Sequence, residues 1–171
     1  MAAAVNTGMR WGELAALEWR DVDSERGLIT VRKPKNNEMR HIPMNKSVQE
    51  ALADHRRRQA RDIGGLVPFV FANQQTRRPY VDVRKRLEES LAQAGITRHI
   101  TFHSLRHTAA SNMIMAGIDP ETVGKILGHK DPKMTKRYTH LAPDYLKQSI
   151  EKLDYSAADR GQEDAKSHEN Q

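Results

Sequence analysis

The chain contains no cysteine, few aromatic residues and no long apolar run. Without cysteine it can form no disulfide framework, no thiolate metal site and no cysteine nucleophile, and it needs no oxidising compartment. No apolar run approaches the roughly 18 residues that span a bilayer. The opening sequence MAAAVNTGMR also lacks the basic-then-apolar order of a secretory signal peptide. These absences lead us to expect a cytoplasmic protein.

Charge is unevenly distributed along the chain. Lys and Arg total 28 against 22 Asp and Glu, which gives a formal net charge of +6 over 171 residues. Residues 156–171 carry two basic and four acidic side chains, so the preceding part holds 26 basic against 18 acidic residues. A basic body favours a polyanionic partner such as nucleic acid, although a basic surface without that function is an alternative.

Length, apolar periodicity and turn signals predict one α+β domain that is mainly helical, followed by a polar tail. We expect helices from Asn6 or Thr7 to about Asp21, over 47–61, 80–94, 102–116 and 143–155, and two short ones after Asp119-Pro120 and Asp131-Pro132. A β-hairpin is expected with strands over 28–31 and 39–43. The run 69–71 could be a strand or a buried coil.

The end of the chain divides into two parts. Leu146, Ile150 and Leu153 form a narrow apolar stripe on a predicted helix, which could dock on its own domain or on a neighbouring molecule. Residues 156–171 lack large apolar side chains. We therefore assign 1–154 to the domain and 155–171 to a tail that we expect to be disordered.

A histidine and an arginine stand three residues apart in the predicted helix 102–116. His103 and Arg106 would share one face, where both could reach the same phosphate, although such a pair alone is usually not catalytic. His103 and His107 also have the i, i+4 spacing of a zinc pair. Ser104 occupies the place of the glutamate found in zinc peptidases, and no cysteine assists. Metal-dependent hydrolysis is therefore the weaker alternative.

Three motifs, in order, resemble the boxes of the tyrosine recombinase (phage integrase) family. The first is Asn6-Thr7-Gly8-Met9-Arg10 with Glu13 following, the second is His103-Ser104-Leu105-Arg106-His107-Thr108, and the third is Leu127-Gly128-His129 followed by Tyr138. The intervals of 23 positions from Arg106 to His129 and nine from His129 to Tyr138 are typical of the family. The family's catalytic-domain fold, with a small antiparallel β-hairpin or sheet at one edge, is what the resemblance implies.

The resemblance also implies a catalytic set and a role for each member. Arg10 and Arg106 would bind the scissile phosphate, His129 would donate a hydrogen bond to it, and His103 would accept the tyrosine proton or organise the nucleophile. Tyr138 would be that nucleophile, about two turns into the helix opened by Asp131-Pro132. Glu13 would orient its neighbours. The full catalytic set is Arg10, Lys35, His103, Arg106, His129 and Tyr138.

The lysine is the least certain member of the set, because Lys33 and Lys35 both lie on the predicted hairpin. Counting back eight places from Pro43 gives Lys35, where the family's lysine usually falls. The resemblance implies that this side chain is the general acid for the leaving 5′ oxygen. The alternative is a turn lysine that contacts the DNA backbone.

The implied reaction needs neither metal nor nucleotide, and no cofactor is expected. Tyr138 would form a 3′-phosphotyrosyl link on double-stranded DNA, and strand exchange would follow in a homotetramer assembled through residues 143–153. The resemblance further implies a bacterial or phage-encoded, nucleoid-associated protein that lacks the family's N-terminal core-binding domain and the helix preceding the first box. The alternative is a catalytically idle DNA-binding or interaction module derived from an integrase.

Overall fold

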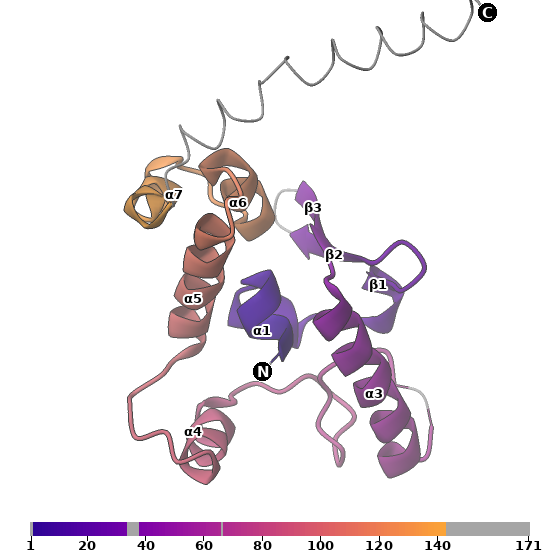
Figure 1. Ribbon diagram of the computed structural model, residues 1–171. Helices are drawn as coiled ribbons and strands as arrows, with labels where there is room; N and C mark the ends of the chain where they lie inside the picture. The colour runs from indigo at the N-terminus through magenta and orange to yellow at the C-terminus, as the bar shows by residue number, and fades with distance from the viewer. Residues whose placement is uncertain (1, 34–37, 66, 143–171) are drawn as a thin grey trace, which may run out of the picture. The chain divides into compact units, whose positions relative to one another are not determined.

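The computed structural model describes residues 2–33, 38–65 and 67–142, and all statements below concern this part of the chain (Figure 1). The helices are α1 (Ala2–Thr7), α2 (Trp11–Ala15), α3 (Lys46–Ile63), α4 (Arg84–Gln93), α5 (Phe102–Met115), α6 (Pro120–Leu127) and α7 (Lys133–Lys136), with 3-10 helices η1 (Trp19–Asp21) and η2 (Thr139–Leu141). The mainly helical α+β class is confirmed. No helix in these ranges is long and apolar enough to cross a membrane.

A three-stranded antiparallel sheet lies at one edge, as predicted, in the order β1 (Val22–Asp23), β2 (Leu28–Lys33), β3 (Glu38–Pro43). The predicted hairpin is β2 and β3. Strand β1 was not predicted, because its two residues fall in the polar stretch 21–27, which we expected only to end the first helix. It forms because Val22 pairs with Ile29 in the register of the sheet.

The main core is built on α1, which packs against α3 and α5 and lies between them in Figure 1. The buried residues of this core are Ala3, Ala4, Met9, Leu14, Leu17, Ile29, Val31, Ile42, Met44, Val48, Leu52, Val70 and Leu105. Helix α6 packs against α5 and against β3. Helices from both ends of the described chain, α1 and α6, therefore pack against α5, and α6 also packs against the sheet.

The predicted start of the first helix was wrong. Thr7 does not cap a following helix; it ends α1, and its hydroxyl donates to the carbonyl oxygen of Ala3. Gly8 then takes a left-handed φ of 62°, which breaks the helical path. Arg10 is extended and becomes the N-cap residue of α2. The chain therefore turns sharply between Gly8 and Arg10, within the first predicted motif.

Other boundaries follow local capping chemistry. Helix α6 begins after Asp119, whose carboxylate accepts from the Thr122 N–H at 2.9 Å, as predicted. Helix α3 ends at the left-handed Gly64. Helix α4 begins at Arg84 and not at residue 80, because the Asp82 carboxylate accepts from the Arg84 N–H at 2.8 Å and so favours a turn there.

Two further segments differ from expectation or refine it. The run 69–71 is a coil with one bridge and not a strand: Phe69 forms an isolated bridge with Glu18, and the Val70 N–H donates to the Leu17 carbonyl at 2.8 Å. Helix α7 is a single turn, so Tyr138 lies just after its end and not two turns inside a longer helix. The predictions for 143–155, for the docking helix 143–153 and for the tail 155–171 lie outside the described residues.

Candidate active site

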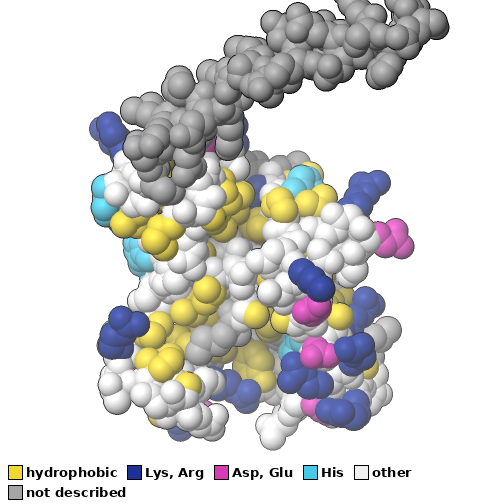
Figure 2. Space-filling model, viewed as in Figure 1, with side chains coloured by type: hydrophobic (Ala, Val, Ile, Leu, Met, Phe, Trp, Pro, Cys, Tyr) yellow, Lys and Arg dark blue, Asp and Glu magenta, His cyan; other side chains and the backbone are white. Residues whose placement is uncertain are grey.

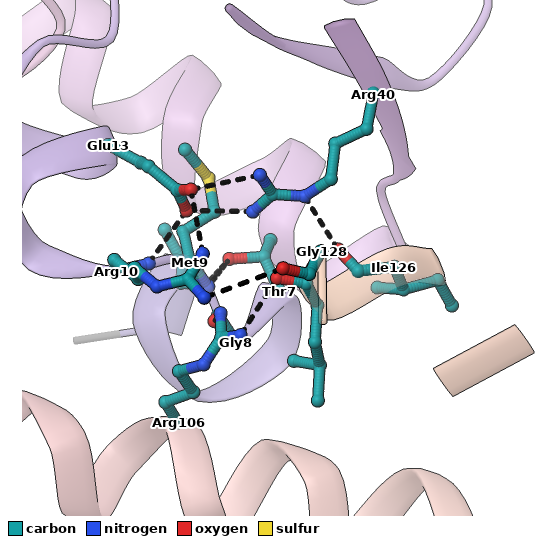
Figure 3. A network of polar contacts seen from close by, with 11 residues as sticks. Thr7, Gly8, Met9, Arg10, Glu13, Arg40, Arg106, Ile126 and Gly128 are labelled. Atoms are coloured by element: carbon teal, nitrogen blue, oxygen red, sulfur yellow. Dashed lines mark hydrogen bonds and ion pairs between the residues drawn. The ribbon is translucent and has the colours of Figure 1, made fainter. Parts of the chain in front are cut away.

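Arg106 is held by two backbone carbonyls at the centre of the domain. It lies on the buried face of α5, and only 6% of its surface is exposed. One terminal guanidinium nitrogen donates to the Gly8 carbonyl at 2.6 Å and the other donates to the Leu127 carbonyl at 2.8 Å (Figure 3). Burial and the charge of Arg10 lower the pKa of Arg106 to about 10. The guanidinium is therefore fixed and still charged at neutral pH, with further N–H donors to offer.

The glycine beside this arginine has a steric reason to be glycine. Gly8 adopts a left-handed φ, and a Cβ at that position would lie 2.3 Å from Cδ2 of Leu127. The absence of a side chain lets the carbonyls of residues 8 and 127 approach Arg106 from two sides. Because the last carbonyls of a helix have no partner within it, the carbonyl of Leu127 at the end of α6 is a ready acceptor for a cation.

Arg10 lies beside this centre and is more exposed, with 44% of its side-chain surface accessible. Its guanidinium contacts a Glu13 carboxylate oxygen at 3.3 Å and donates to the Gly128 carbonyl at 3.4 Å. Its backbone N–H donates to the other Glu13 oxygen at 2.9 Å, which is the reciprocal contact of a helix capping box. Glu13 therefore contacts both the backbone and the side chain of Arg10.

Glu13 is in turn held by Arg40 from strand β3. Two nitrogens of Arg40 donate to the two carboxylate oxygens at 2.9 and 2.7 Å, and its Nε donates to the Ile126 carbonyl at 2.9 Å (Figure 3). Both side chains are only 13% exposed. Burial alone would raise the pKa of Glu13, but the hydrogen bonds from Arg40 and Arg10 and their charges outweigh it and lower that pKa. The carboxylate thus stays ionised between two arginines.

His129 follows the C-terminus of α6 and is oriented by α7. Its Nδ1 is 2.7 Å from Oγ1 of Thr135, a side chain that is 2% exposed. Burial, followed by the charges of Arg106 and Arg10, lowers the pKa of His129 to about 4. The ring is therefore neutral at pH 7. When the threonine hydroxyl donates to Nδ1, the proton of the ring is on Nε2, which is then able to donate a hydrogen bond.

Tyr138 is 8% exposed and its hydroxyl hydrogen-bonds Nδ1 of His107. Burial raises the pKa of Tyr138, against the opposing charges of Arg137 and Arg106. Burial also lowers the pKa of His107, and the charges of His103, Arg137 and Arg106 add to that effect. The phenol is thus protonated at rest and faces a neutral imidazole. The structure gives the tyrosine a histidine partner, but it is not the histidine that we assigned to it.

His103 lies one turn before that partner on α5 and is exposed. Its ring meets the ring of His107 edge-on, with centroids 4.5 Å apart. Within the described residues it makes no hydrogen bond with Tyr138. Lys35 cannot be placed, because residues 34–37 lie outside the description, so the choice between Lys35 and Lys33 stays as the sequence left it.

Four of the sequence-assigned residues share one neighbourhood. The charges of Arg106 and Arg10 both lower the pKa of His129, and the charge of Arg10 lowers the pKa of Arg106. Arg106 and Tyr138 also shift each other's pKa. These side chains come from the turn before α2, from α5, from the end of α6 and from the residue after α7. An anion placed here would meet two guanidinium groups, an imidazole and a phenol, which suits a phosphate diester.

No group of three or more His, Cys, Asp or Glu side chains in the described ranges is arranged to hold a metal ion. His103 and His107 remain a pair, and Nδ1 of His107 is taken by the tyrosine hydroxyl. The arrangement of the described residues therefore offers more to a phosphate than to a metal.

The basic run on α3 is a separate feature with local partners. Arg57 pairs with Asp54 and Arg61 with Asp62, while the Arg56 guanidinium lies 5.2 Å from the centre of the Trp19 ring. Figure 2 shows basic and acidic side chains interspersed over this part of the surface. Arg57 and Arg61 are therefore paired with acidic side chains of the same helix, and Arg56 lies over an aromatic ring of η1.

Sequence reasoning missed three members of the site: Arg40, His107 and Thr135. Arg40 had a usable signal, because it alternates in phase with Ile42, which is buried, and pairs with Val31 across the sheet. A charged residue in phase with the core needs a buried partner. His107 stood in the second motif but was considered only as a zinc ligand. No spacing in the sequence singles out Thr135.

A family model described as the phage integrase family matches residues 1–144. Tyrosine recombinase XerA of Pyrococcus furiosus is 32% identical over 151 residues, which cover 85% of this chain and 50% of the relative. Tyrosine recombinase XerC of Chromohalobacter salexigens is 33% identical over 135 residues, which cover 78% and 44%. The chain thus spans about half the length of the curated relatives it matches.

Solved structures of recombinases and integrases are also similar to this chain. A crystal structure of XerA recombinase aligns with a TM-score of 0.72 and 27% identity, and the alignment covers 90% of this chain and 56% of the XerA chain. The catalytic domain of bacteriophage HP1 integrase has a TM-score of 0.62 with 26% identity, covering 89% and 78%. The Tn1549 transposon integrase in complex with circular intermediate DNA has a TM-score of 0.65 with 25% identity, covering 89% and 58%.

Proposed function

Because this chain belongs to the phage integrase family of tyrosine recombinases, we propose that it is the catalytic part of a site-specific DNA recombinase whose nucleophile is Tyr138. The observation that carries the proposal is a buried tyrosine that interacts electrostatically with the anchored Arg106, on whose pKa the charge of Arg10 also acts. Arg106 is fixed by the Gly8 and Leu127 carbonyls, and Arg10 is oriented by Glu13. This arrangement suits a phosphate diester that bridges the two guanidinium groups.

In the proposed reaction the Tyr138 oxygen attacks phosphorus, a tyrosyl O–P bond forms and the P–O5′ bond breaks. The two arginines and Nε2 of His129 stabilise the negative charge that grows on the nonbridging oxygens. Lys35, assigned from the resemblance alone, gives its proton to the leaving 5′ oxygen. Because the phosphotyrosyl link conserves the energy of the diester, attack by another 5′ hydroxyl rejoins the strands without metal or nucleotide.

Double-stranded DNA is the proposed substrate. The basic balance of the chain supports it, as does the DNA complex of the transposon integrase that this chain resembles. We also propose assembly as a homotetramer on DNA through residues 143–153, a segment outside the described ranges.

The test must not require a known target sequence. Nicked suicide duplexes with randomised arms are incubated with the protein, detergent-resistant protein–DNA adducts are isolated, and their DNA is sequenced. The proposal expects adducts with enriched sequences that vanish in Tyr138→Phe. A folded protein that shifts these duplexes in a gel but forms no Tyr138-dependent adduct would overturn it and support the idle DNA-binding module.

A further inference from the structure

We propose that Arg40 is a positioning residue that keeps Glu13 from capturing Arg10, so that Arg10 stays free to bind the DNA phosphate. The inference deepens the proposed function and rests on it for the identity of the anion. It begins from one carboxylate that lies between two guanidinium groups. Glu13, on α2, contacts Arg10 before that helix and Arg40 on β3, and the two contacts are unequal (Figure 3).

Arg40 takes up both oxygens of the carboxylate. Its two terminal nitrogens donate to different oxygens of Glu13 at 2.9 and 2.7 Å, and its Nε donates to the Ile126 carbonyl at 2.9 Å. The guanidinium also lies against Gly128, where a Cβ would come within 3.1 Å of its central carbon. Since the Arg40 side chain is only 13% exposed, its guanidinium is committed to Glu13 and largely shielded from a ligand.

Arg10 is held more loosely by the same carboxylate. Its guanidinium contacts a Glu13 oxygen at 3.3 Å and the Gly128 carbonyl at 3.4 Å, which are long distances for a hydrogen bond. The side chain of Arg10 is 44% exposed. A guanidinium has five N–H donors, so most of them remain for an anion. These contacts therefore orient Arg10 without using up its capacity to bind phosphate.

The charge balance of the site depends on Arg40. Burial raises the pKa of Glu13, but the hydrogen bonds from Arg40 and Arg10 and the charges of both arginines lower it overall, with the charge of Arg40 acting more strongly than that of Arg10. Arg40 thus compensates most of the negative charge of Glu13. The positive charges of Arg10 and Arg106 then remain available to a phosphate.

Removal of Arg40 turns the loose contact into a competing ion pair. Both oxygens of Glu13 become open to the terminal nitrogens of Arg10, and a bidentate arginine–carboxylate pair is among the strongest polar contacts in proteins. Because Glu13 is only 13% exposed, its freed charge is poorly solvated and gains from such a partner. A captured Arg10 stabilises less of the charge that grows on the nonbridging oxygens. Arg40 therefore acts on the reaction through its neighbours.

The first measurement needs neither DNA nor activity. Rotation about the Nε–Cζ bond of Arg10 is followed by ¹⁵N NMR, because a bidentate ion pair slows this rotation, and Arg10→Lys assigns the signal. We expect slower rotation in Arg40→Gln than in wild type, and no slowing in the double variant Arg40→Gln/Glu13→Gln. Unchanged rotation in Arg40→Gln would overturn the inference, and this result stands whether or not the recombinase proposal survives.

The second measurement is the rate of single-turnover adduct formation, at saturating protein, on a nicked duplex recovered from the randomised pool. Arg40→Gln should lose at least about 100-fold, and the added change Glu13→Gln should restore at least about tenfold by removing the capturing charge. A double variant as slow as Arg40→Gln would contradict the capture of Arg10. A wild type without any adduct would instead refute the proposed function.

A methylphosphonate at the scissile position separates an effect of charge from a structural one, because a methyl group replaces one charged oxygen and makes the phosphate neutral. Less negative charge then develops, so the defect of Arg40→Gln should shrink at least about tenfold. A defect of the same size on both duplexes would make Arg40 a structural residue only and overturn the inference. Arg26→Gln is the control, since Arg26 is 81% exposed and far weaker in its contact with Asp23, at 3.8 Å, and should leave both rates unchanged.

Arg40→Lys keeps the inference testable if Arg40→Gln does not fold. Lysine brings one positive charge to Glu13 but cannot make the two parallel hydrogen bonds of a guanidinium, so one carboxylate oxygen becomes open to Arg10. The loss of rate should be smaller than for Arg40→Gln and should also shrink on the methylphosphonate. An equal loss on both duplexes would again count against the inference. Circular dichroism of each variant establishes that it is folded.

Discussion

Arg40 and Glu13 face each other through two parallel hydrogen bonds of 2.9 and 2.7 Å, one from each terminal guanidinium nitrogen to a different carboxylate oxygen. The pair joins β3 to α2, and Glu13 also receives the backbone N–H and the guanidinium of Arg10. Arg40 therefore reaches the proposed phosphate site only through Glu13. It is a positioning residue that no motif identified.

The first prediction concerns this pair. Because both side chains are only 13% exposed, Arg40→Gln leaves a buried carboxylate without its main partner and should lower the free energy of unfolding by about 3 kcal/mol. A double-mutant cycle with Glu13→Gln, measured by urea unfolding, gives the coupling energy. The same cycle on the exposed pair Arg26 and Asp23 should give less than about 1 kcal/mol. Equal coupling in the two cycles would contradict the prediction.

The second prediction concerns Gly8. Gly8→Ala places a methyl group 2.3 Å from Leu127 Cδ2 at a left-handed φ, so the free energy of unfolding should fall by about 3 kcal/mol. Gly12→Ala is the control, since a Cβ there meets no atom within 4 Å and Gly12 lies inside α2. It should gain up to about 1 kcal/mol. Thermal and urea unfolding measure both, and a Gly8→Ala protein as stable as Gly12→Ala would refute the steric argument.

The third prediction concerns the pH dependence of stability. The folded pKa of His129 is about 4 against 6.5 for the free side chain. Between these values the unfolded chain binds a proton that the folded chain does not. The contribution of His129 to the free energy of unfolding is therefore complete above about pH 6.5 and is lost as the pH falls toward about 4. Urea unfolding from about pH 7.5 to about pH 4.5 should show a shallower decline in His129→Gln than in wild type. Parallel curves would show that His129 is not the titrating group.

The fourth prediction concerns the partner of His129. Thr135→Val keeps the shape of the side chain but removes the oxygen 2.7 Å from Nδ1, so the tautomer that donates from Nε2 is no longer favoured. We expect about 1 kcal/mol less stability and about tenfold slower adduct formation. Thr139→Val is the matched control, because its hydroxyl donates to the Lys136 carbonyl on an exposed surface. A greater loss of rate in Thr139→Val than in Thr135→Val would count against the role of Thr135.

The parts of the fold that the sequence predicted are those set by short-range chemistry. The Asp119-Pro120 start of α6 is a local capping signal, and it holds in the structure. The hairpin followed from alternation and turn residues. The break at Gly8 was missed because an apolar pattern continues through it, and the left-handed turn is imposed by packing against Leu127, more than a hundred positions away.

The candidate site, like the fold, could be predicted from the sequence only in part. Motif resemblance singled out Arg10, Arg106, His129 and Tyr138, and the structure brings them together, although their catalytic roles remain predictions. Resemblance could not choose between two histidines one turn apart on α5, since both lie in the second motif. Only the position of Tyr138 after the short helix α7 decides which of them it meets.

The two carbonyls that hold Arg106 belong to residues 8 and 127, and this separation has a consequence for synthesis. A chain that grows from its N-terminus cannot fix this guanidinium until residue 127 has left the ribosome. Tyr138 lies only eleven positions further along the chain, so it leaves the ribosome soon after residue 127. The anchored arginine and the tyrosine therefore become available almost together during synthesis.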